Sequence, residues 1–308
     1  MIAAYAPATV SNVACGFDVL GFALDAPGDV VTAEAGASPG VEIASIDGDE
    51  GRLSLDPERN TAGAAARALV GRLGAARAIR LRIQKGLPLA SGIGSSGASA
   101  VAAVVAVNEL LGRPAPLEVL LECAMAGEIA GCGSAHPDNV APALYGGFIL
   151  ARTAAPPDIV PLPVPAGLSC AVLHPHLEIE TGTARALLGE LVPLRDAVRQ
   201  WANLGALVAG LHTTDFALIS RALEDHVVEP KRAHLVPGFA SVKRAAVAAG
   251  ALGCSLSGSG PSIFALCGSL ERAERVGEAM RTAFADAELS ADLWISPVSH
   301  QGARVVAA

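Results

Sequence analysis

The chain has 308 residues, enough for one large or two ordinary domains with a sizeable core. Hydrophobic residues make up 52% of it and charged residues 17%, a composition typical of globular proteins. The formal net charge of −8 disfavours a nucleic-acid partner, because a phosphate polymer is bound by a basic surface. The sequence also lacks an uninterrupted apolar stretch of membrane-spanning length. We therefore expect no nucleic-acid partner and no membrane partner.

The cysteines and the first residues of the chain indicate a compartment. The six cysteines are scattered without a C-x-x-C pair, which favours a reducing environment and argues against structural zinc. The first residues lack a basic region followed by an apolar stretch, so we expect no export signal. Together these features predict a cytoplasmic protein.

The first half of the chain alternates short β-type runs with helical patterns. Apolar periodicity predicts strands over residues 2–5, 30–35, 41–46 and 79–83, and helices over residues 61–73, 96–111 and 117–130. Five prolines then fall between Pro156 and Pro165, and such a segment is neither a central strand nor a helix. We interpret it as the crossing between two domains, residues 1–160 and residues 161–308.

The second half continues with both kinds of element. The predicted strands span residues 168–173, 252–256, 262–266 and 293–296, and the predicted helices span residues 194–211, 215–225, 239–249 and 270–284. This pattern indicates an α+β fold.

A glycine- and serine-rich loop, residues 88–99, leads into the helix predicted from residue 96. Gly92 and Gly94 can adopt a positive φ and let a ligand approach the backbone closely. Exposed N–H groups and the positive end of the helix would then face a phosphate. The alternative is an ordinary helix with a serine N-cap after a glycine turn. The lysine of the G-x-x-x-x-G-K-[ST] phosphate loop is missing, so the loop is not of that type.

Several motifs together resemble the superfamily named for galactokinase, homoserine kinase, mevalonate kinase and phosphomevalonate kinase, the GHMP kinases. Residues 88–97 match P-x-x-x-G-[LI]-G-S-S-[AG], the second signature of these enzymes, and residues 257–262 are similar to the third. Residues 6–21 read A-P-A-x-x-x-N-x-x-x-G-F-D-x-L-G, which resembles the homoserine kinase family in particular. The H-x-D-N-V-A-P of residues 136–142, the E-P-K-R of residues 229–232 and the G-A-R-V of residues 302–305 extend the resemblance over essentially the whole chain.

The resemblance implies a two-domain architecture, with an N-terminal domain like the second domain of ribosomal protein S5 and a ferredoxin-like C-terminal domain. It implies phosphoryl transfer from ATP to L-homoserine, giving O-phospho-L-homoserine in threonine biosynthesis, with Mg²⁺ as cofactor. A kinase of the same superfamily for another small alcohol is one alternative. A non-catalytic regulator that binds a metabolite on the same fold is a second alternative. A homodimer is left open.

The resemblance also assigns the nucleotide and metal sites. The hydroxyl of Ser96 and the carboxylate of Glu128 would hold Mg²⁺; alternatively, Glu128 is a solvated side chain near the end of a helix. Asn60 is equally well explained as an N-cap, and Lys85 as a surface charge on a strand. The residues implied to bind the nucleotide are Asn60, Thr61, Lys85, Pro88, Leu89, Ala90, Ser91, Gly92, Ile93, Gly94, Ser95, Ser96, Gly97, Ala98, Ser257, Gly258, Ser259 and Gly260.

Homoserine is a zwitterion with a terminal hydroxyl, so its site needs groups for each charge. By resemblance, Asp18 would pair with the α-ammonium group, and Asn12 would hydrogen-bond beside it. Arg185 and Arg232 would clamp the carboxylate, because a guanidinium group matches a carboxylate bidentately. His136 falls where the family contacts substrate. The alternatives are a turn residue for Asp18, surface charges for both arginines and a loop histidine for His136.

Asn139 and Thr181 fall nearest the reacting hydroxyl in the resemblance. No residue convincingly fills the role of a catalytic base. Because the transition state of phosphoryl transfer is loose, positioning and charge stabilisation can carry most of the catalysis. We retain Asp138 as a participant. Lys231 stands where an aromatic residue is common in the family, and we expect this change to affect only local packing.

Overall fold

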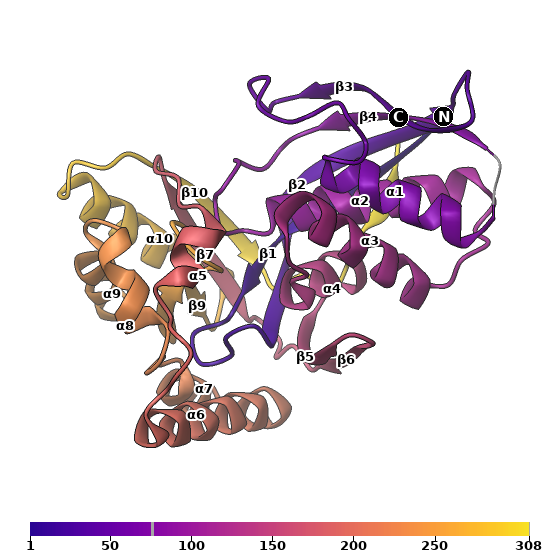
Figure 1. Ribbon diagram of the computed structural model, residues 1–308. Helices are drawn as coiled ribbons and strands as arrows, with labels where there is room; N and C mark the ends of the chain where they lie inside the picture. Colours follow the sequence, from indigo (N-terminus) through magenta and orange to yellow (C-terminus); the bar gives the residue numbers. More distant parts are fainter. Residues whose placement is uncertain (75–76, 308) are drawn as a thin grey trace.

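The computed structural model describes residues 1–74 and 77–307, which form two β-sheets with helices packed against them (Figure 1). The first sheet has the strand order β11-β1-β2-β4-β3, with β5 paired to β2 and β6 paired to β5. Its strands are β1 (Ile2–Ser11), β2 (Leu20–Ala35), β3 (Gly40–Asp47), β4 (Ala78–Gln84), β5 (Phe148–Ala154), β6 (Pro157–Leu162) and β11 (Arg304–Val306).

The N-terminal half of the chain also contains the helices α1 (Thr61–Arg72), α2 (Ser95–Leu110), α3 (Leu117–Cys132) and α4 (Pro137–Tyr145). Helix α2 packs on β1 and β2, and α1, α3 and α4 pack around it. Its alanine and valine side chains are buried on nearly all sides, as expected for a helix without a polar face. These contacts with the core hold the first turn of α2 in place.

The second sheet is antiparallel, with the order β10-β7-β9-β8. Its strands are β7 (Ser169–Pro175), β8 (Gly253–Leu256), β9 (Ile263–Cys267) and β10 (Ala291–Pro297). Helices α9 (Phe239–Ala248) and α10 (Leu270–Ala285) pack on this sheet. The remaining elements are α5 (Thr181–Ala186), α6 (Leu194–Thr213), α7 (Phe216–Ala222), α8 (Glu229–Arg232) and a 3₁₀ turn at Ala233–Leu235.

Every predicted strand and helix is present, and the α+β class is confirmed. Strands β1 and β2 are longer than predicted because they pair from Ile2 and Ala33 as far as Ser11 and Gly21. The sequence analysis missed the elements α4, α5, α8, β5, β6 and β11. Helix α4 lacks a clear helical pattern because Pro142 lies inside it.

The interpretation of the proline-rich segment as a crossing between domains is only partly right, because the segment contains a strand. Its first part is β6, which pairs with β5 at the margin of the sheet, where missing N–H donors are tolerated. The chain passes to the second sheet between Leu162 and Ser169, and β11 returns to pair with β1. The division at residues 160 and 161 thus falls inside β6, and a two-domain division remains a proposal.

None of the helices in residues 1–74 and 77–307 is long and apolar enough to cross a membrane. Free, buried thiols are found at Cys15, Cys123, Cys170, Cys254 and Cys267.

Candidate active site

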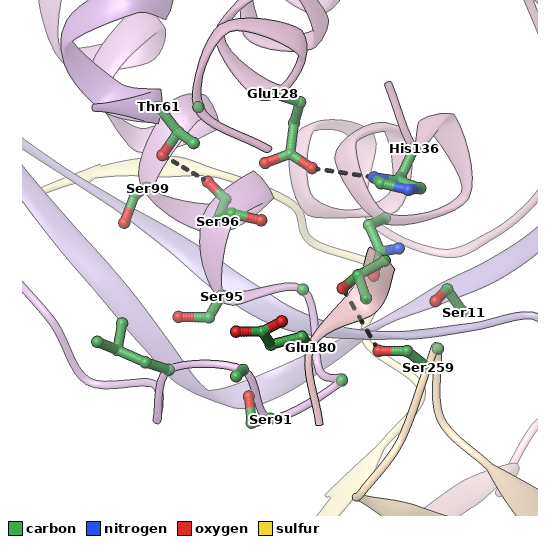
Figure 2. A pocket seen from close by; sticks show the side chains of 18 of the residues that line it. Ser11, Thr61, Ser91, Ser95, Ser96, Ser99, Glu128, His136, Glu180 and Ser259 are labelled. Atoms are coloured by element: carbon green, nitrogen blue, oxygen red, sulfur yellow. Dashed lines mark hydrogen bonds and ion pairs between the residues drawn. The ribbon is translucent and has the colours of Figure 1, made fainter. Parts of the chain in front are cut away.

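A cavity of about 650 Å³ is lined by residues of both halves of the chain. Figure 2 shows its labelled side chains, among them Ser95 and Ser96 at the start of α2, Glu128 on α3 and Ser259 from the loop between β8 and β9. Helix α5 contributes Thr181 and Arg185. The cavity therefore brings together segments that are far apart in the sequence.

The first turn of α2 presents free backbone donors to this cavity. Its N-cap is Gly94, with φ of 74°, and no described side chain caps the helix. The alternative of a serine N-cap is therefore wrong. A Cβ atom on Gly94 would lie 2.1 Å from the Oγ1 atom of Thr9, so both the conformation and the space require glycine. Uncapped N–H groups at a helix start are suited to binding a phosphate.

A buried ion pair, Asp29 with Lys85, contacts the end of the glycine loop and the first turn of α2. The Nζ atom of Lys85 pairs with the carboxylate of Asp29 and donates to the carbonyl of Ser95 at 3.0 Å and to the Oγ of Ser99 at 2.9 Å. Asp29 also accepts a hydrogen bond from the N–H of Leu87 at 3.1 Å. The alternative of Lys85 as a surface charge is wrong, because its side chain is only 2% exposed. Lys85 instead places a positive charge directly behind the first turn of α2.

The loop between β8 and β9 is hydrogen-bonded to the glycine loop. The Oγ of Ser257 donates to the carbonyl of Gly92 at 2.8 Å, and the N–H of Ser262 donates to the carbonyl of Ser91 at 3.2 Å. A Cβ atom on Gly92 would lie 2.5 Å from the carbonyl oxygen of Ser257. The two loops therefore fit closely and hold each other in place.

Glu128 lies on α3 and is only 2% exposed, so the alternative of a solvated glutamate is wrong. Its Oε2 atom lies 3.4 Å from the Nδ1 atom of His136 (Figure 2). Its Oε1 atom is buried and has no hydrogen-bond partner among the described residues. The hydrogen bond to Glu128 raises the pKa of His136 above its usual value.

The donor set around Glu128 fits a magnesium ion. Mg²⁺ is a hard cation that takes few protein oxygens and keeps several waters, and it prefers carboxylate and hydroxyl oxygens. Glu128 offers an unpartnered carboxylate oxygen, and Ser96 lines the same cavity with its hydroxyl. No cluster of three or more acidic, histidine or cysteine side chains suited to a metal occurs in the described part of the chain. A site built from two protein ligands would complete its coordination with phosphate oxygens and water.

The predicted partners of the substrate's two charges are paired with each other. The Nη2 atom of Arg185 donates to both carboxylate oxygens of Asp18 at 2.9 Å. The N–H of Asp18 donates to the Oδ1 atom of Asn12 at 3.0 Å, and the Nδ2 atom of Asn12 donates to the carbonyl of Gly258 at 2.7 Å. Asp18 itself has a φ of 58°, a conformation that this hydrogen-bonded turn supports.

Arg232 is 2% exposed, so the alternative of a surface charge is wrong for it. Its Nε atom donates to the carbonyl of Ala184 at 3.1 Å, and burial lowers the pKa of its guanidinium group. The Cζ atoms of Arg185 and Arg232 lie 5.5 Å and 5.4 Å from the ring centroid of Phe17. The negative face of an aromatic ring attracts both cations and helps to hold them close together.

The two residues predicted nearest the reacting hydroxyl, Asn139 and Thr181, line the cavity, and so does Asp138, which was retained as a participant. Burial and the charge of Asp18 raise the pKa of Asp138 to about 7, and its Oδ1 atom has no hydrogen-bond partner among the described residues. The Oδ1 atom of Asn139 accepts a hydrogen bond from the Oγ1 atom of Thr9 at 3.0 Å. The Oγ1 atom of Thr181 lies 3.5 Å from the Oγ atom of Ser259.

Comparison with known proteins places the chain in a family. Residues 60–147 match the family model described as the GHMP kinases N terminal domain, and residues 196–286 match the GHMP kinases C terminal model. The homoserine kinase of Chlorobium phaeovibrioides (strain DSM 265 / 1930) is 50% identical over 314 residues, covering 98% of each protein. The chain belongs to the GHMP kinase family.

Solved structures of this family share the fold. The homoserine kinase of Cytophaga hutchinsonii ATCC 33406 matches with a TM-score of 0.97 and 51% identity, covering 99% of this chain and 97% of that one. The L. major mevalonate kinase in complex with R-mevalonate matches with a TM-score of 0.70 and 15% identity, covering 96% of this chain and 95% of that one. The second likeness shows the fold alone. The predicted GHMP kinase architecture is confirmed.

All residues predicted to bind substrate, to take part in catalysis or to hold the metal line the cavity. Asn60 lines the cavity as well. It is also the N-cap of α1, as the alternative interpretation predicted, because its side chain accepts a hydrogen bond from the N–H of Ala62 at 3.0 Å. Some residues predicted to bind nucleotide do not line it: Pro88, Ile93, Gly97, Ala98, Ser257 and Gly260.

The positions of these residues outside the cavity lining have local reasons. Ile93 and Ala98 are fully buried in the core, and Gly97 faces Val140. Ser257 is used to hold Gly92, as described above. Pro88 lines a separate cavity of about 360 Å³.

The sequence analysis missed several residues of the site, among them Arg52, Arg59, Glu180 and Phe17. Arg52 and Arg59, from the loop between β3 and α1, line the cavity, and Glu180 faces it from the segment before α5 (Figure 2). The Nη2 atom of Arg52 donates to the Oε2 atom of Glu178 at 2.8 Å, which links the two halves of the chain. The sequence carried no motif signal for these residues. Phe17 was detectable, because it lies between the glycine and the aspartate of the G-F-D motif.

Proposed function

We infer that the chain is a homoserine kinase, which transfers the γ-phosphoryl group of ATP to the hydroxyl of L-homoserine and releases ADP and O-phospho-L-homoserine. Identity of 50% to a homoserine kinase over 98% of the chain supports this assignment. The observation that carries it is the cluster of Asp18, Arg185 and Arg232 in the same cavity as the uncapped start of α2 and Glu128. Such a site offers one anion and two cations beside a phosphate-binding loop. The product is the one that threonine biosynthesis uses.

The charges of this cluster match an amino acid. The α-carboxylate can take the place of Asp18 on Arg185, and the α-ammonium group can take the place of Arg185 on Asp18. The side chains of Arg185 and Asp18 are 43% and 39% exposed. Ion pairs that are this exposed to solvent are weak, so the pair can open when the substrate binds. Arg232 already lies beside Arg185 on Phe17, so the carboxylate would meet two guanidinium groups.

The nucleotide phosphates would meet the start of α2. Its uncapped N–H groups and the ammonium of Lys85 behind them attract negative charge. Glu128 and Ser96 would hold Mg²⁺, which when bound would neutralise charge on the phosphates and help to orient them. We propose ATP as the phosphoryl donor and Mg²⁺ as the cofactor on this basis.

The hydroxyl of the substrate would be oriented by Asn139 and Thr181 and would lose its proton to Asp138. A carboxylate whose pKa is about 7 is partly ionised at neutral pH, and its free Oδ1 atom can accept a hydrogen bond. As the hydroxyl oxygen forms its bond to the γ-phosphorus, the bond to the leaving ADP breaks and the proton passes to Asp138. The buried carboxylate thus takes the role that the sequence left unfilled.

The alternatives fit the cluster less well. A neutral sugar offers nothing to two arginines, and mevalonate has no ammonium group for Asp18. A regulator released from catalysis would have no use for the buried, unpartnered carboxylate of Glu128. We propose the cytoplasm as the compartment, which the free thiols of the core suit.

An ADP-release assay with a panel of acceptors tests the function. We would compare L-homoserine, D-homoserine, L-serine, mevalonate and galactose, with the Glu128→Gln variant as a control for contaminating ATPase. We expect the highest kcat/KM for L-homoserine by at least tenfold. A preference for mevalonate or galactose would establish the other small-alcohol kinase, and no ADP release with any acceptor would establish the regulator.

A further inference from the structure

Gln200 is the polar member of the buried residues of α6, and it is only 8% exposed. Its Nε2 atom donates to the carbonyl of Cys15 at 3.1 Å and to the Oδ1 atom of Asp225 at 3.0 Å. Its Oε1 atom accepts a hydrogen bond from the N–H of His226 at 2.9 Å. The amide thus uses both of its donor hydrogens on segments outside its own helix. Gln200 does not line the cavity of the candidate site, so any part it has in the reaction is exerted through these segments.

The first of these segments is the turn of residues 12–18, which carries Asp18. Its residues 12–14, an asparagine, a valine and an alanine, have φ of 68°, 39° and 58°. A positive φ is unfavourable for such residues, most of all for the β-branched valine, and it persists where the surrounding structure holds the backbone. Cys15 comes directly after these residues, so the hydrogen bond from Gln200 to its carbonyl helps to hold the turn. The position of the Asp18 carboxylate depends on this turn.

The second segment, residues 225–232, carries Arg232. The carboxylate of Asp225 accepts hydrogen bonds from three successive N–H groups, those of residues 227, 228 and 229, at 2.8 to 2.9 Å. These groups lead into α8, which has four residues and ends at Arg232. Gln200 donates to the same carboxylate and so fixes the rotation of the Asp225 side chain. The orientation of this short helix, and with it the position of Arg232, therefore depends on Gln200.

Gln200 thus connects the segment that carries Asp18 with the segment that carries Arg232. The two segments meet at Phe17, because the Cζ atom of Arg232 lies 5.4 Å from its ring centroid. An α-amino acid has its ammonium group and its carboxylate on one carbon atom, so the groups that bind them must keep a fixed separation. Binding groups of this kind must be held within about 0.5 Å of the productive geometry. We propose, on the basis of the function proposed above, that Gln200 is a positioning residue that sets the separation between Asp18 and Arg232.

Gln200→Met tests this role, because methionine has a length and a helix propensity similar to those of glutamine but no amide. We would measure KM and kcat for L-homoserine and KM for ATP by ADP release. We expect KM for homoserine to rise by about tenfold or more and kcat to change less, because the charge partners hold the substrate in the ground state as well as in the transition state. KM for ATP should stay at the parental value. An unchanged KM for homoserine would overturn the proposal.

Asn203 provides the matched control on the next turn of α6. Its Nδ2 atom donates to the carbonyl of Glu224 at 3.0 Å. Asn203→Ala therefore removes a hydrogen bond between the same helix and the same loop, but leaves the contacts to Cys15 and Asp225 in place. We expect parental KM values from this variant, with thermal unfolding as the check that both variants fold. A rise of KM for homoserine as large as that of Gln200→Met would show that the docking of α6, rather than the amide of Gln200, is responsible.

Gln200→Asn is a second variant for the case that Gln200→Met is unstable. Its amide is one methylene shorter and cannot bridge the same acceptors in Cys15 and Asp225, so we expect the same selective rise of KM for homoserine. A stable Gln200→Asn variant with the parental KM would likewise overturn the proposal.

Combination with Asp18→Asn distinguishes positioning from a general loosening of the fold. Residues that act through a shared contact give losses that are not additive. The factor by which Gln200→Met raises KM for homoserine should therefore be smaller by about threefold or more in the Asp18→Asn background. Equal factors in the two backgrounds would contradict a role through Asp18. A parent protein that does not phosphorylate homoserine would refute the proposed function itself, whereas an active parent with a silent Gln200→Met variant would refute only the role of Gln200.

Discussion

Glu128 leaves a buried carboxylate oxygen without a partner among the described residues, next to the start of α2. An unpaired buried charge is unfavourable, so such a group is retained where a cation binds it. The hydrogen bond from His136 at 3.4 Å is long and satisfies only the other oxygen. We therefore propose that the role of this residue rests on its charge.

Glu128→Gln removes that charge and keeps the shape of the side chain. We expect kcat to fall by orders of magnitude at saturating Mg²⁺, because an amide cannot replace a carboxylate at a hard cation. Glu122→Gln on the same helix is the control, since Glu122 is 44% exposed and should leave kcat unchanged. Thermal unfolding would check that both variants fold. A Glu128→Gln enzyme with parental kcat would remove Glu128 from the metal site.

Asp138 predicts a pH dependence. Burial raises its pKa to about 7, so the carboxylate form that we propose as the proton acceptor is lost as the pH falls below that value. The value of kcat/KM for homoserine, which reports on the free enzyme, should rise with pH up to about 7 and then level off. Asp138→Asn should lower it by roughly 10²-fold or more and give a flat profile below pH 7. A variant with the parental profile would show that another group titrates.

At the scale of elements, the start of α2 depends on two glycines in different ways. Gly94 has a positive φ, and a Cβ atom there would collide with Thr9. Gly97 lies inside the helix, and its Cβ atom would meet Val140 at an ordinary contact distance of 3.5 Å. The first glycine is required by the turn, whereas the second is not.

Gly94→Val should therefore abolish the protection that ATP gives in a thermal unfolding assay and should also lower the unfolding temperature itself. Gly97→Ala should keep ATP protection and gain up to about 1 kcal/mol of stability, because alanine is the better helix former. If Gly94→Val were protected by ATP as well as the parent protein, the phosphates would not lie at the start of α2.

The buried pair of Asp29 and Lys85 links β2 and the end of β4 to the start of α2. Lys85→Met leaves the carboxylate of Asp29 buried without its cation, which should destabilise the protein by about 3 to 5 kcal/mol. The double variant Lys85→Met with Asp29→Asn should recover part of this loss, since no unpaired charge remains. Urea denaturation would measure both. A single variant as stable as the double variant would show that the pair is not coupled.

At the scale of the whole molecule, the long elements could be predicted because their apolar periodicity is continuous. The short helices α4, α5 and α8 could not, because tertiary contacts determine them more than local pattern does. The strand β11 could not be predicted either, because it has only three residues and is defined by its pairing with β1. Local sequence carries little information about such pairings.

The sequence motifs predicted residues of one site, and the structure shows that these residues line one cavity. Asp18, Arg185, Arg232 and Glu128 all reached one cavity, although they are far apart in the chain. The burial of Lys85 could not be predicted, because it depends on Asp29 in β2, a strand that is far from Lys85 in the sequence but adjacent to β4 in the sheet. The same is true of the loop arginines and of Glu180, whose positions depend on how the two halves of the chain pack together.

The proposed recognition of a zwitterion by Asp18 and the two arginines is tested most directly by one comparison. We would measure kcat/KM for L-homoserine and for 4-hydroxybutyrate, which lacks the amino group, in the parent protein and in Asp18→Asn. Homoserine should lose roughly tenfold to a hundredfold in the variant, a factor of ten corresponding to about 1.4 kcal/mol. 4-Hydroxybutyrate should lose much less, because it never used the carboxylate. Equal losses on both substrates would contradict the contact between Asp18 and the ammonium group.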